Sequence, residues 1–184
     1  MIANGQFILI TRNCYQAIGT HAAVRHEVAE DLAMAQAYFR AGRRQLFVFG
    51  LELMGTRMYT SLAGMIEGWS KNVYVGGRRS YPDEPVRRAL VPLMFALGGL
   101  FWLVPPAVLG LGLAGILPAW TAVAGWATAF SALFWMLFDA GFGIGPLYGL
   151  TYPLGVGMTG WIFARSVLRG GRRIEWRGRT YSSE

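Results

Sequence analysis

The longest apolar stretch of the chain runs from Ala89 to Ala164 and contains one formal charge, Asp139. The rest of this stretch is apolar and is interrupted only by glycine, proline, threonine and serine. A membrane-spanning helix needs about 20 apolar residues. The pattern therefore predicts a helical membrane domain, with spans at residues 90–113, 119–138 and 147–168.

Two features of this apolar stretch qualify the three predicted spans. Pro105 and Pro106 should kink or divide the first helix, and Pro153 the third, because proline removes a helical hydrogen bond. Asp139 has two interpretations: an acid inside a membrane is a functional candidate, whereas an acid at a helix end can simply face interfacial water.

Before residue 89 the hydrophobic pattern changes. Residues 6–11 and 45–49 are short apolar runs typical of buried strands, and residues 27–41 have the apolar spacing of a helix that Gly42 ends. The order strand, helix, strand predicts a fragment of an α/β sheet with too few strands to close a core.

A further amphipathic helix is predicted at residues 57–75, with Glu67 and Lys71 as an i, i+4 pair on its polar face. Because it precedes the membrane domain, it can rest in the interface; the alternative is a helix that faces a core. Its apolar stripe comprises Met58, Leu62, Met65, Ile66, Trp69 and Val73.

Charge and composition narrow the classes of function. The chain has 184 residues, 54% hydrophobic, and a net charge of +7. Its cations flank the apolar stretch, a pattern that places both flanks in the cytoplasm at the inner membrane and attracts anionic lipids. No recognition motif for nucleic acid accompanies this charge. Two flanks on one side require an even number of crossings, whereas length favours three, and the sequence leaves this conflict open.

The remaining polar candidates are few. Cys14 is the only cysteine, which excludes an intramolecular disulfide and a thiolate metal site. His21 and His26 lack a third ligand at metal spacing. Glu30 and Asp31 open the predicted helix 27–41, where the helix dipole favours carboxylates in any protein.

Six motifs along the chain resemble, in order and spacing, the second half of a membrane-bound family 2 glycosyltransferase of the ceramide glucosyltransferase and hopanoid-associated type. They are GQFILI at 5–10, Tyr15 through Gly19-Thr20-His21, Glu30-Asp31, TRMY at 56–59, GWSKN at 68–72 and WRGRTY at 176–181. The resemblance implies that the Glu30-Asp31 pair is catalytic and that Asp31 is the general base for the acceptor hydroxyl. It also makes Arg57, His21 and Trp69 candidate substrate-binding residues.

The sequence departs from that family in three ways. Only half of the arginine-rich motif around Arg57 is present, and Thr20 replaces the second glycine of the usual Gly-Gly. The family's N-terminal sheet, which holds the nucleotide sugar and a divalent metal (Mg or Mn), has no counterpart here. The complete enzyme should therefore need a further nucleotide-binding half, without which this chain is expected to be inactive.

These observations predict four regions: part of a GT-A-like catalytic domain at 1–54, an interfacial helix and basic linker at 55–88, membrane helices at 89–168 and a basic cytoplasmic tail at 169–184. The function implied is transfer of a sugar from a nucleotide sugar to a membrane lipid. The alternative is a non-catalytic membrane module that binds lipid or a partner protein. The tail is expected to bind lipid headgroups or to pack under the catalytic domain, the alternative being a solvated tail.

Overall fold

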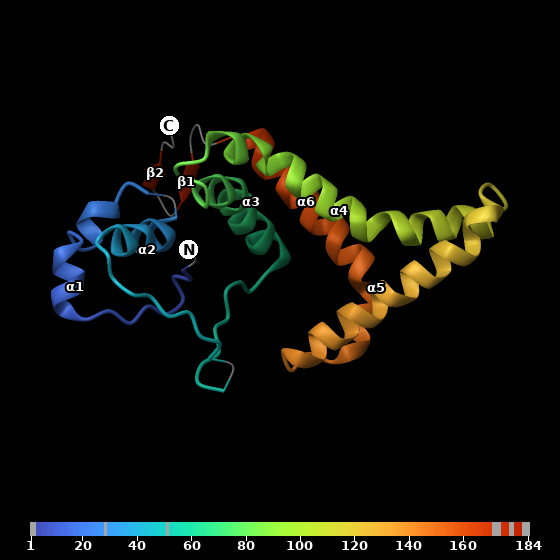
Figure 1. Cartoon of the computed structure of the whole chain (residues 1–184), viewed down its shortest axis with the longest axis horizontal. Helices are drawn as coiled ribbons and strands as arrows, with labels where there is room; N and C mark the ends of the chain where they lie inside the picture. The colour runs from blue at the N-terminus through green and yellow to red at the C-terminus, as the bar shows by residue number, and fades with distance from the viewer. Residues whose placement is uncertain (1–2, 28, 51, 171–173, 177–178, 182–184) are drawn as a thin grey trace. The chain divides into compact units, whose positions relative to one another are not determined.

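The computed structural model describes residues 3–27, 29–50, 52–170, 174–176 and 179–181. It is a helical protein whose contacts form two compact units (Figure 1). The first comprises Met1–Val91 and Phe163–Glu184, and the second Pro92–Ile162. The helices α4 (Pro85–Leu113) and α6 (Tyr152–Arg169) each contribute residues to both units.

The first unit contains α1 (Arg12–Ala17), the 3₁₀ helix η1 (His21–Val24), α2 (Glu30–Arg40) and α3 (Leu62–Arg79). Its only assigned strands in the described residues are β1 (Ile174–Trp176) and β2 (Arg179–Tyr181), an antiparallel hairpin in which Trp176 lies opposite Arg179. The basic residues 172, 173 and 177 of the predicted tail lie outside the described residues.

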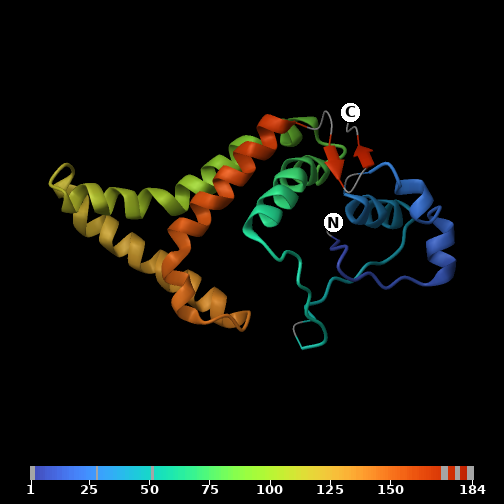
Figure 2. The same ribbon diagram turned by 180° about the vertical axis from the view of Figure 1, so that it is seen from behind.

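The prediction of an α/β fragment, a partial GT-A-type sheet, is wrong. Neither residues 6–11 nor residues 45–49 form a strand. Leu9 and Leu46 are 88% and 84% exposed, and an irregular connection of about twenty residues joins α2 to α3 (Figure 2). An apolar, β-branched run becomes a strand only beside another strand that pairs with its backbone. The described part of the chain provides no such neighbour.

Helix α2 confirms the predicted helix at 27–41, although it starts at Glu30. Its buried face comprises Leu32, Met34 and Ala35, whereas Phe39 is 63% exposed. Gly42, with a φ of 68°, follows the end of this helix as predicted. Val28, a member of the predicted apolar face, lies outside the described residues.

The end of α3 is held against the α2 region. The side-chain amide of Gln36 donates a hydrogen bond of 2.7 Å to the carbonyl of Arg79, and the Arg79 guanidinium forms an ion pair with Glu27. An otherwise unpaired carbonyl at a helix end thereby gains a donor. Sequence order alone gives no sign that α2 supplies it.

Another side of α3 contacts α6. The two carboxylate oxygens of Glu67 accept hydrogen bonds from Arg169 at 2.7 and 3.1 Å, and Arg165 adds a third at 3.3 Å. Tyr74 donates its backbone N–H to Ser166 Oγ and packs edge-on against Phe163. Glu67 is also the residue predicted to pair with Lys71, and its carboxylate oxygens contact Arg165 and Arg169 of α6.

The predicted apolar stripe of α3 is only partly covered. Leu62 and Trp69 are 60% and 42% exposed, while Ser70 and Val75, which lie off the stripe, are buried. The helix also begins at Leu62 rather than at residue 57, and the hydroxyl of Ser61 caps it by accepting the N–H of Gly64.

The second unit contains η2 (Pro118–Trp120), α5 (Thr121–Gly141) and η3 (Pro146–Thr151) between the two shared helices. Among the described residues, two helical segments are long and apolar enough to cross a membrane, Pro85–Leu113 and Pro118–Gly141. The prediction of three spans is thus reduced to two, because α6 does not meet this criterion. Helix α4 is not divided at Pro105 and Pro106.

Aromatic rings join the helices of the second unit around Trp102 of α4. Its ring stacks on Phe134 at 5.1 Å and meets Trp135 at 5.4 Å, both on α5, and Tyr152 of α6 at 6.3 Å. These rings provide the tight packing that helix association within lipid requires.

Gly149 of η3 lies directly on the backbone of α5. A Cβ atom at this position would stand 2.6 Å from Met136 Cα. Two glycines near the end of α4 differ from each other: Gly112 approaches Thr121 at the turn into α5, whereas a side chain at Gly110 would meet open space.

We expect Gly149→Ala to destabilise the second unit by about 1–3 kcal/mol, because the backbone of α5 has to shift to admit the methyl group. Gly155→Ala is the matched control, since a side chain there meets open space. Thermal unfolding in detergent, followed by tryptophan fluorescence, measures both. Equal transition temperatures for the two variants would contradict the close approach at Gly149.

The contact between α3 and α6 predicts an acid-sensitive stability. The Arg169 hydrogen bond, aided by the charges of Arg169 and Arg165, lowers the pKa of Glu67 below its ordinary value. A carboxylate with a lowered pKa stabilises the folded state above the unfolded pKa, and that contribution is lost as the pH falls through the folded pKa. The loss should thus begin near the ordinary glutamate value, about 4.3, and continue below it.

Glu67→Gln should remove this pH dependence and lower the free energy of unfolding at neutral pH by about 1 kcal/mol or less, since the pair is partly solvated. Glu84→Gln, which breaks an exposed pair with Arg87, is the control. Unfolding temperatures of the three proteins, measured in detergent from neutral pH into acid, test this. An unchanged acid limb in Glu67→Gln would contradict the assignment.

Candidate functional site

Asp31 lies on the first turn of α2, and backbone N–H groups bind both of its carboxylate oxygens. Gly5 donates to Oδ2 at 2.8 Å and Leu32 donates to Oδ1 at 2.7 Å. A Cβ atom at Gly5 would lie 3.3 Å from Oδ2, so the absence of a side chain permits this approach. The contact joins two of the motifs on which the family resemblance depends, 26 residues apart.

Glu30, the other member of the acidic pair, is exposed on the same turn, while Asp31 is half-buried. Both lie on the first turn of α2, at the positive end of the helix dipole. Only Asp31 is held in a defined orientation by partners elsewhere in the chain. The structure therefore distinguishes two neighbouring carboxylates that the sequence treats alike.

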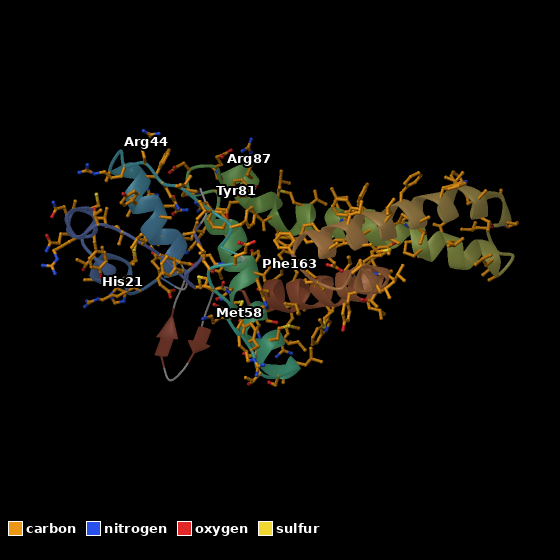
Figure 3. All side chains as sticks on the ribbon, turned by 90° about the horizontal axis from the view of Figure 1, so that it is seen from below. His21, Arg44, Met58, Tyr81, Arg87 and Phe163 are labelled. Carbon is orange, nitrogen blue, oxygen red and sulfur yellow. The ribbon has the colours of Figure 1, made fainter. Side chains whose placement is uncertain are left out.

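His21 is exposed at the start of η1, in the blue part of the ribbon (Figure 3). Tyr15 holds it twice: the phenolic oxygen lies 2.6 Å from His21 Nδ1 and accepts the His21 backbone N–H at 3.1 Å. The signal in the sequence is a tyrosine six residues before a histidine, across a turn at Gly19 and Thr20. The sequence analysis included Tyr15 in a motif but did not identify it as the partner of His21.

Thr20 has an unusual backbone conformation, with φ of 61° and ψ of −168°. This region is essentially restricted to glycine, because a Cβ atom crowds the neighbouring carbonyl. Thr20 is also where the sequence departs from the family's Gly-Gly. Its hydroxyl accepts the N–H of Ala22, which partly compensates for the strain.

Arg57 and Trp69 lie in another part of the first unit. Arg57 is exposed in the connection before α3 and forms no ion pair with any described residue. Tyr59, two residues on, packs so closely on Gly68 that a Cβ there would overlap its ring. Trp69 follows Gly68 and is 42% exposed.

The predicted site residues are thus arranged as local pairs. Asp31 pairs with Gly5, His21 with Tyr15, and the motif of Arg57 meets that of Trp69 through Tyr59 and Gly68. Within the described ranges, no hydrogen bond or ion pair joins Asp31, His21, Arg57 and Trp69 to one another.

Cys14 of α1 and Tyr38 of α2 form a further polar pair. A hydrogen bond with Thr11, and then one with Tyr38, lowers the pKa of the Cys14 thiol. The same thiol raises the pKa of the Tyr38 hydroxyl. The pair connects α1 to α2 beside the segment that holds His21.

In the described part of the chain, no three histidine, cysteine, aspartate or glutamate side chains gather into one cluster. Asp139, the other acidic candidate, is half-buried in the last turn of α5.

Comparison with known proteins finds no protein family, curated protein or solved structure that matches the chain. The resemblance to glycosyltransferases consequently rests on the six motifs alone.

Thr20→Gly should raise the free energy of unfolding by about 1 kcal/mol, because glycine relieves the strained φ, ψ pair at the cost of one hydroxyl hydrogen bond. Thr60→Gly is the control: its φ is not positive, so the substitution should be neutral or destabilising. Thermal unfolding in detergent measures both. A less stable Thr20→Gly protein would contradict the strain at this turn.

Proposed function

We propose that this chain is the acceptor-side, membrane-embedded portion of a family 2 glycosyltransferase, which transfers a sugar from a nucleotide sugar to the hydroxyl group of a membrane lipid. The observation that carries the proposal is the hydrogen bond between Gly5 and Asp31. It brings together two separate motifs of the family, and it aims the carboxylate that the resemblance identifies as the base.

Asp31 meets the chemical requirements for a general base in this reaction. Two N–H donors fix its orientation and leave lone pairs on each oxygen for a further hydrogen bond. The acceptor hydroxyl transfers its proton to Asp31 while its oxygen attacks the anomeric carbon of the sugar. The bond from that carbon to the diphosphate breaks, and the nucleoside diphosphate leaves with the bonding electrons.

The donor substrate binds, in this proposal, to a nucleotide-binding half that lies outside these 184 residues. When bound there, Mg²⁺ or Mn²⁺ neutralises charge on the leaving diphosphate. Arg57, His21 and Trp69 are assigned to substrate binding. Glu30 adds a second acidic side chain to the first turn of α2.

The apolar surface of the second unit supports a membrane location. Phe101, Trp126 and Phe130 are between 66% and 69% exposed. Burying apolar surface is worth about 25 cal/mol per Å², so such rings belong against lipid rather than water. Two spans would keep both basic flanks on one side, which we assign to the cytoplasmic face of the inner membrane.

A second candidate function has its own observation. Both oxygens of Asp31 already accept backbone N–H groups, which is also how a purely structural carboxylate caps a helix. This favours a non-catalytic module that binds lipid or a partner protein. The two candidates differ in whether the Asp31 charge matters to chemistry or only to folding.

Asp31→Asn should lower sugar transfer by about 10²–10⁴-fold, the usual contribution of a general base. The amide keeps one acceptor oxygen and much of the shape of the carboxylate. The measurement is transfer of radiolabelled sugar to extracted membrane lipid by the chain expressed with its nucleotide-binding half. Asp83→Asn, in the exposed loop before α4, is the matched control and should keep full activity.

Glu30→Gln separates the two acids, and we expect a much smaller loss than for Asp31→Asn. Unchanged transfer by Asp31→Asn would exclude the catalytic role and favour the non-catalytic module. A thermal unfolding curve of Asp31→Asn distinguishes loss of chemistry from loss of folding.

A further inference from the structure

Two hydrogen bonds through the phenolic oxygen join Tyr15 to His21. The phenolic oxygen of Tyr15 accepts the backbone N–H of His21 at 3.1 Å, and the same oxygen lies 2.6 Å from Nδ1. A phenol has one proton to donate. Within the described part of the chain, Nδ1 is the acceptor that lies within reach of that proton.

The Tyr15 oxygen could also accept from Nδ1–H, but its own proton would then have only solvent to donate to. Directing that proton at Nδ1 satisfies both groups and makes Nδ1 an acceptor without a proton of its own. In a neutral imidazole the other nitrogen then carries the proton, since the bond made by one nitrogen sets the state of the other. Nε2–H is the free end of the ring, and the side chain is exposed.

The chain around His21 is electropositive. Residues 12–26 contain Arg12 and Arg25 and no acidic residue, and both arginines are exposed. The strained turn at Thr20 fixes the backbone immediately before the ring. An exposed N–H donor in a segment whose only charged side chains are arginines suits an anionic oxygen.

We propose that Tyr15 is a positioning residue that holds His21 as the Nε2–H tautomer, so that the ring donates a hydrogen bond to a phosphate oxygen. The ligand class is a phosphate group, carried either by a free diphosphate or by a lipid headgroup. A free diphosphate rests on the proposed function, because a glycosyltransferase releases a nucleoside diphosphate. The tautomer itself does not depend on that function.

His26 is an internal reference, because its hydrogen bond favours the opposite tautomer to that of His21. Arg25 donates its Nε–H to His26 Nε2 at 2.9 Å. Arginine has no acceptor, so His26 Nε2 is the unprotonated nitrogen and Nδ1–H is favoured. The two histidines of the chain are thus expected to be opposite tautomers.

The test is a long-range ¹H–¹⁵N correlation spectrum of the whole chain, labelled at histidine, in neutral detergent micelles. It is recorded in mildly alkaline buffer, and the ¹⁵N shifts themselves show which nitrogens of each ring carry a proton. We expect a protonated Nε2 for His21 and a protonated Nδ1 for His26. Tyr15→Phe should shift the His21 resonances toward a tautomer mixture and leave those of His26 in place, and Arg25→Gln should do the reverse.

Two additions then identify the source of the phosphate. Inorganic pyrophosphate should move the His21 Nε2–H resonance in the wild type, and much less in Tyr15→Phe, if the ligand is a free diphosphate. Phosphatidylglycerol added to the same micelles should move it instead if the ligand is a lipid headgroup. Loss of the response in His21→Asn, measured on the backbone amides of residues 20–22, confirms that the ring binds the anion.

A wild-type spectrum with His21 protonated at Nδ1, or with a mixture that Tyr15→Phe leaves unchanged, would overturn the proposal. So would the absence of any shift with both phosphate compounds. The wild-type spectrum decides the tautomer even if Tyr15→Phe does not fold. An Asp31→Asn protein with full transfer activity would overturn the proposed function alone and leave the Tyr15–His21 assignment standing.

Discussion

The contact between the Glu67 carboxylate and the two arginines of α6 connects the end of α6 to α3 within the first unit. It joins positions 98 and 102 residues apart in the sequence, so the entire membrane region forms a closed loop between them. Closing so long a loop costs conformational entropy, and the buried Ser166 and Phe163 beside Tyr74 add the packing that offsets this cost. The end of α6 thereby becomes part of the unit that carries Asp31 and His21.

The second unit has the internal hydrogen bonding that a membrane-spanning segment needs, because lipid supplies no hydrogen-bond partners. Its helices satisfy their own backbone, and hydroxyls such as Thr128 and Ser131 donate to carbonyls one turn earlier, at 2.7 and 2.9 Å. Two groups depart from this rule: Trp135 Nε1 and Tyr152 Oη are buried without a hydrogen-bond partner among the described residues. Both belong to the rings around Trp102, where aromatic packing compensates for the missing partners.

In the candidate site, hydrogen bonds orient single side chains, but the predicted site residues make little contact with one another. Asp31 is aimed by two backbone donors and His21 by one phenol, whereas Arg57 lies exposed in an irregular segment. In the proposed function, this arrangement suits a surface whose oriented side chains contact a bound substrate and a further nucleotide-binding domain. The strained backbone of Thr20 directly precedes His21, and strained backbone is often found at functional positions.

Local pattern in the sequence was enough to predict α2, the glycine that ends it, the amphipathic α3 and the long apolar helices, because helical periodicity and apolar length depend on neighbouring residues alone. The two predicted strands at 6–11 and 45–49 failed, since a strand requires a partner that no local pattern supplies. Only the tertiary structure decided that Glu67 pairs with Arg165 and Arg169 of α6, that Gly5 binds Asp31 and that Tyr15 orients His21. Each of these residues has several chemically suitable partners in the sequence. The partner that it contacts depends on which distant positions the folded chain brings together.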